Sequence, residues 1–272
     1  MSYLKNEGFT HCLNSGRERD GIIAAIHRDG CPIAHLDPKR GFKAESDVLR
    51  SLGFPEMNDR EIGISRAHRG TFKWVYLNPR HQAGSRLGRS NFRKPESGKS
   101  TLMKYLMRSK NTFRCLSNWV QEPGGFVSYS FFFWNNNMEM QMSIEGLLPT
   151  ILYQALKQLP SLLIQEVSRG RIEVLNLFVD DYTLWTLAEL EQGLRRLVFD
   201  ICPNRKFFFL IDGLDECSGD HGALTNILLD LSSSVGTILK RCLANRPWTS
   251  FEYTFRGKPH LMLHHLAAGD IE

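Results

Sequence analysis

The sequence has no long apolar run and no paired cysteines. Apolar runs such as Phe131–Trp134 and Phe207–Ile211 are far too short to span a bilayer, and the residues after Met1 form no signal-peptide core. The six cysteines are scattered without a CxxC pair or a His cluster at ligand spacing, which argues against a zinc site and a disulfide framework. These absences predict a cytoplasmic chain that does not bind a membrane.

Positive charge is concentrated in the first part of the chain. The net charge is +5, but residues 1–110 hold 21 Lys and Arg against 11 Asp and Glu, and the remainder is acidic. A basic half suits nucleic acid or an acidic surface. No aromatic-interleaved basic motif accompanies it, so a solvated basic face is the better-supported interpretation, and nucleic acid is not predicted as a partner.

Apolar periodicity divides the chain into four segments. Residues 1–44 show no sustained period and are predicted to be poorly ordered. Residues 45–77 read as a helical lead-in, with a first helix that a glycine and a proline end, and a second helix from Asp59 to Val75. Residues 78–97 are basic, contain Gly, Ser and Pro, and are predicted to be a loop. Residues 98–272 form the remaining and largest segment.

Strands and helices alternate in this largest segment. Val127–Trp134 and Lys206–Ile211 are short apolar runs, typical of strands buried in a parallel sheet. Helices are predicted after Gly98, from Ser143 to Pro160, and after Thr186, where a capping box is expected. The alternation predicts an α/β fold of three layers with a mainly parallel sheet.

The first motif that carries chemistry is a short turn before a predicted amphipathic helix. A phosphate loop needs small residues whose backbone N–H groups curl round a phosphate, a Lys for the terminal phosphates and a hydroxyl for magnesium. Such a tetrapeptide also recurs by chance on protein surfaces, but its place at a helix start favours the phosphate loop. The sequence predicts that ATP or GTP with Mg²⁺ binds at Ser97, Gly98, Lys99, Ser100 and Thr101.

The second motif follows the buried strand that ends at Asp212. In phosphoryl-transfer sites a strand-end Asp holds the magnesium, usually through water, and a nearby acidic residue orients or deprotonates the attacking water. Asp212 is therefore predicted, with Ser100, to hold the metal. Glu216 is predicted to act on the water, with Asp215 as its rival. The alternative is a strand cap with solvated carboxylates.

Several segments between residues 45 and 272 share the motifs of one family. They are Asp59–Trp74, Ser97–Leu106, Phe131–Trp134, Ser143–Leu148, Trp185–Leu190, Asp212–Glu216 and Arg246–Trp248. They resemble the fungal NACHT-type proteins of the signal-transducing NTPase class, including those with a nephrocystin-like N-terminal module. The resemblance implies that residues 98–272 form a nucleotide-binding NACHT-like domain whose nucleotide state controls signalling in self/non-self recognition.

The resemblance also implies partners and one further residue role. Related proteins assemble, which implies homo- or hetero-oligomers with other NACHT proteins. Arg246 corresponds to a catalytic-site arginine that senses the terminal phosphate. The residues alone favour a different interpretation of Arg246, a salt bridge at a strand end.

Three departures separate this chain from the family pattern. Arg93 and Glu96 stand where the family has glycine, which reduces backbone flexibility and places a carboxylate beside the expected phosphate. Residues 84–93 contain little apolar material for the strand that normally precedes a phosphate loop, so that central strand is predicted to be missing or badly formed. The chain stops at Glu272, before the family's winged-helix and repeat regions, which predicts a C-terminally truncated domain.

Two functions follow from these observations. The first is a nucleotide-binding NACHT-like module with slow hydrolysis at most. The second is a degenerate, non-enzymatic remnant that acts as an interaction or regulatory partner of full-length relatives. A small-molecule kinase would need an Arg-bearing lid and an acceptor pocket, and residues 135–183 show neither clearly.

Overall fold

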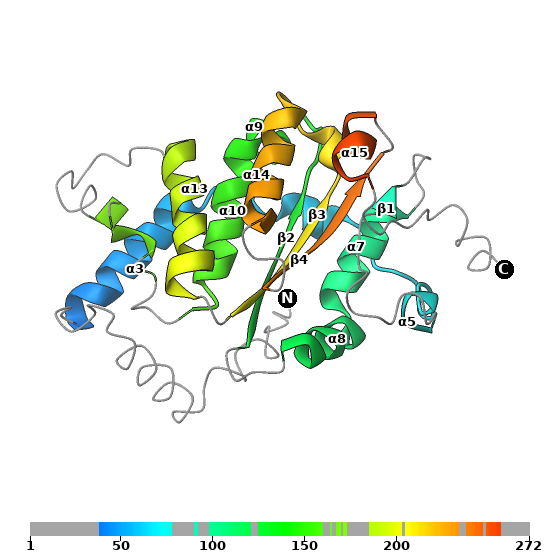
Figure 1. The fold of residues 1–272 in the computed structure, drawn as a ribbon, viewed down its shortest axis with the longest axis horizontal. Helices are drawn as coiled ribbons and strands as arrows, with labels where there is room; N and C mark the ends of the chain where they lie inside the picture. The colour runs from blue at the N-terminus through cyan, green and yellow to red at the C-terminus, as the bar shows by residue number, and fades with distance from the viewer. Residues whose placement is uncertain are drawn as a thin grey trace. The chain divides into compact units, whose positions relative to one another are not determined.

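The chain divides into two compact units, Met1–Ala44 and Glu45–Glu272. Of the first unit only residues 38–44 are described, so the predicted poor order of residues 1–37 lies outside the described residues. No described helix is long and apolar enough to cross a lipid bilayer. The computed structural model describes residues 38–77, 90–91, 98–120, 125–159, 164, 167–169, 171–172, 185–202, 205–233, 238–246 and 249–256 (Figure 1).

The first described helix, α3, spans Pro38–Leu52 and so begins before residue 45, where the lead-in was predicted to start. Proline suits the first helical position because its fixed φ is helical and its missing N–H would have no partner there. The side chains of Val48 and Leu52 are buried, as their helical spacing predicts. The N–H of Gly53 donates to the carbonyl of Leu49 at 3.2 Å and ends the helix.

Two short helices, α4 (Asp59–Gly63) and α5 (Trp74–Leu77), replace the single helix predicted from Asp59 to Val75. That prediction is wrong, because the intervening backbone turns through the left-handed region at Gly70 (φ 103°) and Phe72 (φ 66°). A right-handed helix cannot contain such residues. The apolar spacing in this segment marks burial and not a helix.

The sheet has four described strands, all parallel, in the order β1-β4-β3-β2. β3 lies between β4 and β2, and the side chains of Phe207, Phe208 and Phe209 are at most 1% exposed. A strand that is buried on both faces reads as a continuous apolar run, which is why it was recognisable in the sequence. The α/β fold with a parallel sheet is confirmed. The strands are β1 (Ser90–Asn91), β2 (Phe126–Phe132), β3 (Lys206–Asp212) and β4 (Leu239–Asn245).

Strand β1 is much shorter than its neighbours. Ser90 and Asn91 lie opposite Ala244 and Asn245 of β4. This two-residue strand lies inside the segment predicted to be a basic loop, where a central strand was predicted to be missing or badly formed. The other residues of 78–97 lie outside the described residues.

Helices cover both faces of the sheet (Figure 1). On one face lie α7 (Lys99–Arg108) and α8 (Lys110–Val120). On the other lie α10 (Ile144–Leu156), α13 (Leu187–Arg195) and α14 (His221–Ser233). Right-handed crossovers explain the division, because the chain steps along the sheet in one direction from β1 to β2 and in the other from β2 to β4. The result is the predicted three-layer fold. The shorter elements are α9 (Glu139–Met142), η2 (Arg196–Ile201), η3 (Leu214–Glu216) and α15 (Thr249–Thr254).

The apolar core on the α7 face joins the lead-in segment to the sheet. Its buried members come from residues 64–75, from α7 and α8, and from β2, β3 and β4. Burial of this kind is the main force that fixes one element on another. The members are Ile64, Phe72, Val75, Leu102, Met103, Leu106, Leu116, Phe132, Phe208, Leu210, Cys242 and Ala244.

The capping box predicted at the start of α13 is confirmed. The N–H of Glu189 donates to the Thr186 hydroxyl at 3.2 Å, and the N–H of Thr186 donates to the Glu189 carboxylate at 2.7 Å. These two bonds satisfy N–H groups that have no partner within the helix.

The side chains of Gln154 in α10 and of Gln158, just past the end of that helix, pair with the free edge of β2, the last of the described strands in the sheet. The Gln154 side chain accepts from the N–H of Ser130 at 2.9 Å and donates to its carbonyl at 3.0 Å. Gln158 pairs with Ser128 in the same way, at 3.2 and 2.8 Å. Four residues of helix rise about 6 Å and two of strand about 6.6 Å, so the two side-chain amides match the spacing of the strand.

Candidate functional site

The predicted phosphate turn lies at the start of α7. Gly98 precedes the helix with φ 73°, in the left-handed region that favours glycine. Its carbonyl accepts from the N–H of Leu102 at 2.8 Å, so Lys99, Ser100 and Thr101 form the first helical turn. N–H groups in a first turn have no helical partner and favour an anion. Three residues of the predicted loop lie outside the described residues: Arg93, Glu96 and Ser97.

The aromatic ring of Phe72 supports this turn from the lead-in segment. A Cβ atom placed on Gly98 would lie 3.7 Å from Phe72 Cζ. The ring also packs against Tyr105 of α7, with centroids 5.7 Å apart. Phe72 holds the left-handed backbone that side chains rarely adopt, and such positions persist only where the surroundings fix them.

Asp212 is the buried acidic residue of the site. It ends β3 and is 2% exposed, and its side chain is hydrogen-bonded to Ser100. Its Oδ1 atom is buried and has no hydrogen-bond partner among the described residues. Burial raises the pKa of this carboxyl to about 6, and the Glu216 carboxylate acts in the same direction, whereas the Ser100 hydrogen bond and the Lys99 charge oppose the rise. The structure thus brings the two predicted metal-binding residues together.

Lys99 lies within electrostatic reach of the other predicted site residues. Partial burial lowers the pKa of its ammonium group. The carboxylates of Asp215, Asp212 and Glu216 raise that pKa, and the Arg246 guanidinium lowers it. The turn and the acidic motif, far apart in the sequence, therefore form one charged site at the carboxyl ends of the strands.

Asp215 and Arg246 form an ion pair at the ends of β3 and β4. The Asp215 side chain is 3% exposed, and its Oδ2 lies 3.3 Å from Nε of Arg246. Its Oδ1 accepts from the backbone N–H of Arg246 at 2.7 Å. This is the strand-end salt bridge that the residues alone favoured. Both oxygens of Asp215 are engaged, which leaves that carboxylate little capacity to act on a water.

Glu216 is held by the segment that follows β2. Its Oε2 accepts from the N–H of Asn135 at 3.1 Å. The backbone turns towards Glu216 through Gly213, whose φ of 73° lies in the left-handed region and whose Cβ, if it had one, would lie 3.2 Å from the carbonyl oxygen of Phe133. The N–H of Phe133 donates to the Asp212 carbonyl at 3.0 Å, so the ends of β2 and β3 are joined.

Two residues of this region were not found by sequence reasoning. Asn245 is fully buried beside Arg246, and its Oδ1 has no hydrogen-bond partner among the described residues. Its place directly before Arg246, at the end of the short apolar stretch 242–244, was the available signal. Arg60 of α4 lies with its guanidinium 5.4 Å from the Trp134 ring centre, and its charge lowers the pKa of Asp212. Nothing in the sequence links Arg60 to either motif.

A comparison with known families matches residues 70–246 to the family described as Nephrocystin 3, N-terminal. The match covers more than half of the chain. The chain belongs to this family. The expected likeness to a nephrocystin-like module is confirmed at this level, whereas no curated protein and no solved structure matches the chain.

The family match encloses the charged site of this nephrocystin 3 N-terminal chain. The turn at Gly98–Thr101, the motif Asp212–Glu216 and Arg246 all fall within it, and Arg246 is its last residue. Arg60 and α4 precede the match. Most residues of the site therefore lie within the matched range, and Arg60 lies outside it.

The oxygen atoms of this nephrocystin 3 N-terminal site suit magnesium. In the described parts of the chain no cluster of three or more His, Cys, Asp or Glu side chains is present. Magnesium bound with a nucleotide needs only one or two protein oxygens, since phosphates and waters complete its shell. The Ser100 hydroxyl is an oxygen ligand of the right kind, and the buried Asp212 Oδ1, which has no partner among the described residues, can accept from a water of the magnesium shell. The residues present therefore fit the metal.

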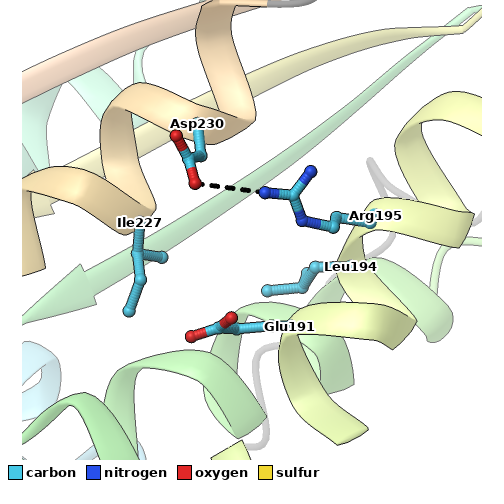
Figure 2. A pocket seen from close by; sticks show the side chains of 5 residues that line it. All are labelled: Glu191, Leu194, Arg195, Ile227 and Asp230. Carbon is cyan, nitrogen blue, oxygen red and sulfur yellow. Dashed lines mark hydrogen bonds and ion pairs between the residues drawn. The ribbon is translucent and has the colours of Figure 1, made fainter. Parts of the chain in front are cut away.

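A small pocket elsewhere in the nephrocystin 3 N-terminal fold has no link to these residues. It lies between α13 and α14, where Arg195 and Asp230 form an ion pair at 3.1 Å (Figure 2). Glu191, Leu194 and Ile227 complete its lining. No predicted site residue contributes to it, and both charges are neutralised by each other.

Proposed function

We propose that this nephrocystin 3 N-terminal chain is a NACHT-like module that binds ATP or GTP with Mg²⁺ and hydrolyses it slowly at most. One observation carries the proposal. Lys99 and Ser100, at the start of α7, converge with Asp212 at the end of the central strand. A cation and a hydroxyl at a helix start, facing a buried carboxylate, are the parts that a nucleotide–magnesium complex requires.

Each side chain has a defined role in this proposal. Lys99 binds the β and γ phosphates. Ser100 holds the magnesium directly, and Asp212 holds it through a water. Magnesium, when bound, neutralises phosphate charge. Glu216 orients the attacking water, because among the described residues only its Oε2 accepts a hydrogen bond, from the N–H of Asn135.

Arg246 and Asp215 act together in the proposal. Arg246 contacts Asp215 through Nε and its backbone N–H, so the terminal amino groups of its guanidinium remain to reach a phosphate. Asp215 thereby positions Arg246. Slow hydrolysis is expected because, among the described residues before the turn, Ser90 and Asn91 alone form the strand β1 that supports it.

Binding of labelled ATP and GTP to the full chain, with and without Mg²⁺, tests the proposal. We expect the Lys99→Ala variant to lose at least about tenfold in affinity, since a charge-assisted bond to phosphate contributes about 1.5–3 kcal/mol. Lys73→Ala is the matched control, because Lys73 is exposed on the lead-in segment. Chelation of Mg²⁺ should weaken binding to a similar extent. Equal binding by the wild type and Lys99→Ala would overturn the proposal.

The second candidate is a non-enzymatic partner of related NACHT proteins, which assembles without nucleotide. The short β1 strand favours it, because a phosphate turn normally depends on a full strand for rigid support. Co-purification with a full-length relative, compared between the wild type and Lys99→Ala, tests it. Assembly that needs Lys99 and nucleotide would exclude this candidate.

A further inference from the structure

Arg60 lies near Asp212 of the proposed nucleotide site, and its guanidinium donates no hydrogen bond to any described residue. It belongs to the first turn of α4, and its guanidinium lies 5.4 Å from the ring centre of Trp134, just beyond the end of β2. Its Nε atom is buried and has no hydrogen-bond partner among the described residues. A buried, unsatisfied donor is costly, so its presence calls for an explanation.

The backbone that carries Arg60 is fixed to the helix that carries Lys99 and Ser100. Lys104 of α7 is 5% exposed and donates to the carbonyls of Glu61 and Ile64 at 2.5 and 2.6 Å. Arg108 of α7 pairs with the Glu61 carboxylate at 2.8 Å. α4 and the phosphate turn therefore share one rigid support, and the position of Arg60 relative to the turn is set by the fold.

Nearby cations have partners, whereas Arg60 forms no ion pair within the described residues. Arg246 forms an ion pair with Asp215, and Lys104 donates hydrogen bonds to backbone carbonyl groups. The charge of Arg60 acts on Asp212 without a bond to it. The cation–π contact with Trp134 uses the charge of the guanidinium and satisfies none of its N–H donors. An anion brought by a ligand would satisfy them.

We propose that Arg60 contacts the terminal phosphate of a nucleoside triphosphate bound at Lys99 and Ser100, and so makes the site prefer triphosphate over diphosphate. This inference rests on the proposed nucleotide binding. The guanidinium is suited to the role because it holds several donors in one plane and matches phosphate oxygens. Helix α4, which precedes the nephrocystin 3 N-terminal match, thereby supplies a specificity-determining residue.

The test compares triphosphate and diphosphate affinities in four forms of the full chain. These are the wild type, Arg60→Gln, Arg60→Lys and the control Arg69→Gln, whose arginine is exposed on the same segment. The probes are a non-hydrolysable triphosphate analogue and the matching diphosphate, each with Mg²⁺, measured by calorimetry. We expect Arg60→Gln to bind the triphosphate about 10- to 100-fold more weakly and the diphosphate unchanged. Arg60→Lys should lie between, and Arg69→Gln should match the wild type.

Each outcome bears on the inference separately from the proposed function. Equal weakening of both nucleotides in Arg60→Gln, or no weakening of either, would overturn the role of Arg60 while leaving nucleotide binding intact. A wild type that binds neither nucleotide would overturn the proposed function and this inference together. Melting temperatures report whether each variant folds. If Arg60→Gln does not fold, a wild-type triphosphate preference in Arg60→Lys would overturn the inference, and a reduced one would support it.

Discussion

β3 and β1 each lead into one half of the candidate site, but they are supported very differently. β3 pairs with a strand on both sides, with β2 along all of Lys206–Asp212 and with β4 along Phe207–Ile211. β1 pairs through Ser90 and Asn91, with β4 alone among the described strands. The carboxylates that follow β3 are thus supported by the sheet. The phosphate turn, Gly98–Thr101, is supported by contacts outside the sheet.

Those contacts come from the lead-in segment. Phe72 lies against Gly98, and Lys104 binds the backbone after α4 through two short hydrogen bonds. A phosphate turn can therefore be positioned from its helix side as well as from its strand side. Three pairs of substitutions test how much each support contributes to stability.

The largest effect is expected in the central strand. Phe209 is fully buried, and Phe209→Ala should lower the free energy of unfolding by about 3–5 kcal/mol through lost burial and a cavity. Asn91→Gly in β1 should cost about 0.5–1 kcal/mol through backbone entropy, because β1 pairs with β4 alone among the described strands. Urea unfolding followed by circular dichroism measures both. A loss at Asn91 as large as that at Phe209 would contradict the difference between the two strands.

A smaller effect is expected where α7 binds the lead-in segment. Lys104→Met keeps the side-chain length but leaves the carbonyls of Glu61 and Ile64 without their donor, which should cost about 1–3 kcal/mol. Arg108→Met removes a half-exposed ion pair on the same helix and should cost about 1 kcal/mol or less. Thermal unfolding compares the two. If Arg108→Met were the more damaging, the buried lysine would not be the main link.

The smallest effect concerns the turn after β3. Gly213 and Gly219 both have positive φ, 73° and 95°, and an alanine at either position is strained by about 1–2 kcal/mol. At Gly213 the new Cβ would also lie 3.2 Å from the Phe133 carbonyl oxygen, whereas at Gly219 it meets nothing within 4 Å. Gly213→Ala should therefore be the more destabilising in chemical unfolding. Equal losses of unfolding free energy in the two variants would contradict the expected steric conflict at Gly213.

Sequence reasoning succeeded where one local pattern matched one local structure. The apolar runs of β2 and β3 and the capping box at Thr186 have direct sequence signatures, and all three are confirmed. The helix predicted from Asp59 to Val75 failed because apolar spacing records which side chains are buried. It does not record that the backbone at Phe72 is left-handed.

The candidate site was predictable only in part, for a related reason. Lys99, Ser100 and Asp212 were recognisable because helix starts and strand ends have characteristic residues. Arg60 was not, because its position depends on how Lys104 anchors α4, a contact between distant segments. The role of Arg246 was open to two interpretations, and its partner in a salt bridge, Asp215, was not predicted because it lies at the end of another strand.

The pairing of Gln154 and Gln158 with β2 has a consequence for how another strand can meet this edge of the sheet. An open strand edge invites any other strand to extend the sheet, and many proteins aggregate in that way. Here the backbone groups of Ser128 and Ser130 are already taken by Gln158 and Gln154 of the same chain. A second strand therefore cannot extend the sheet through these backbone groups unless the two glutamine side chains first release them.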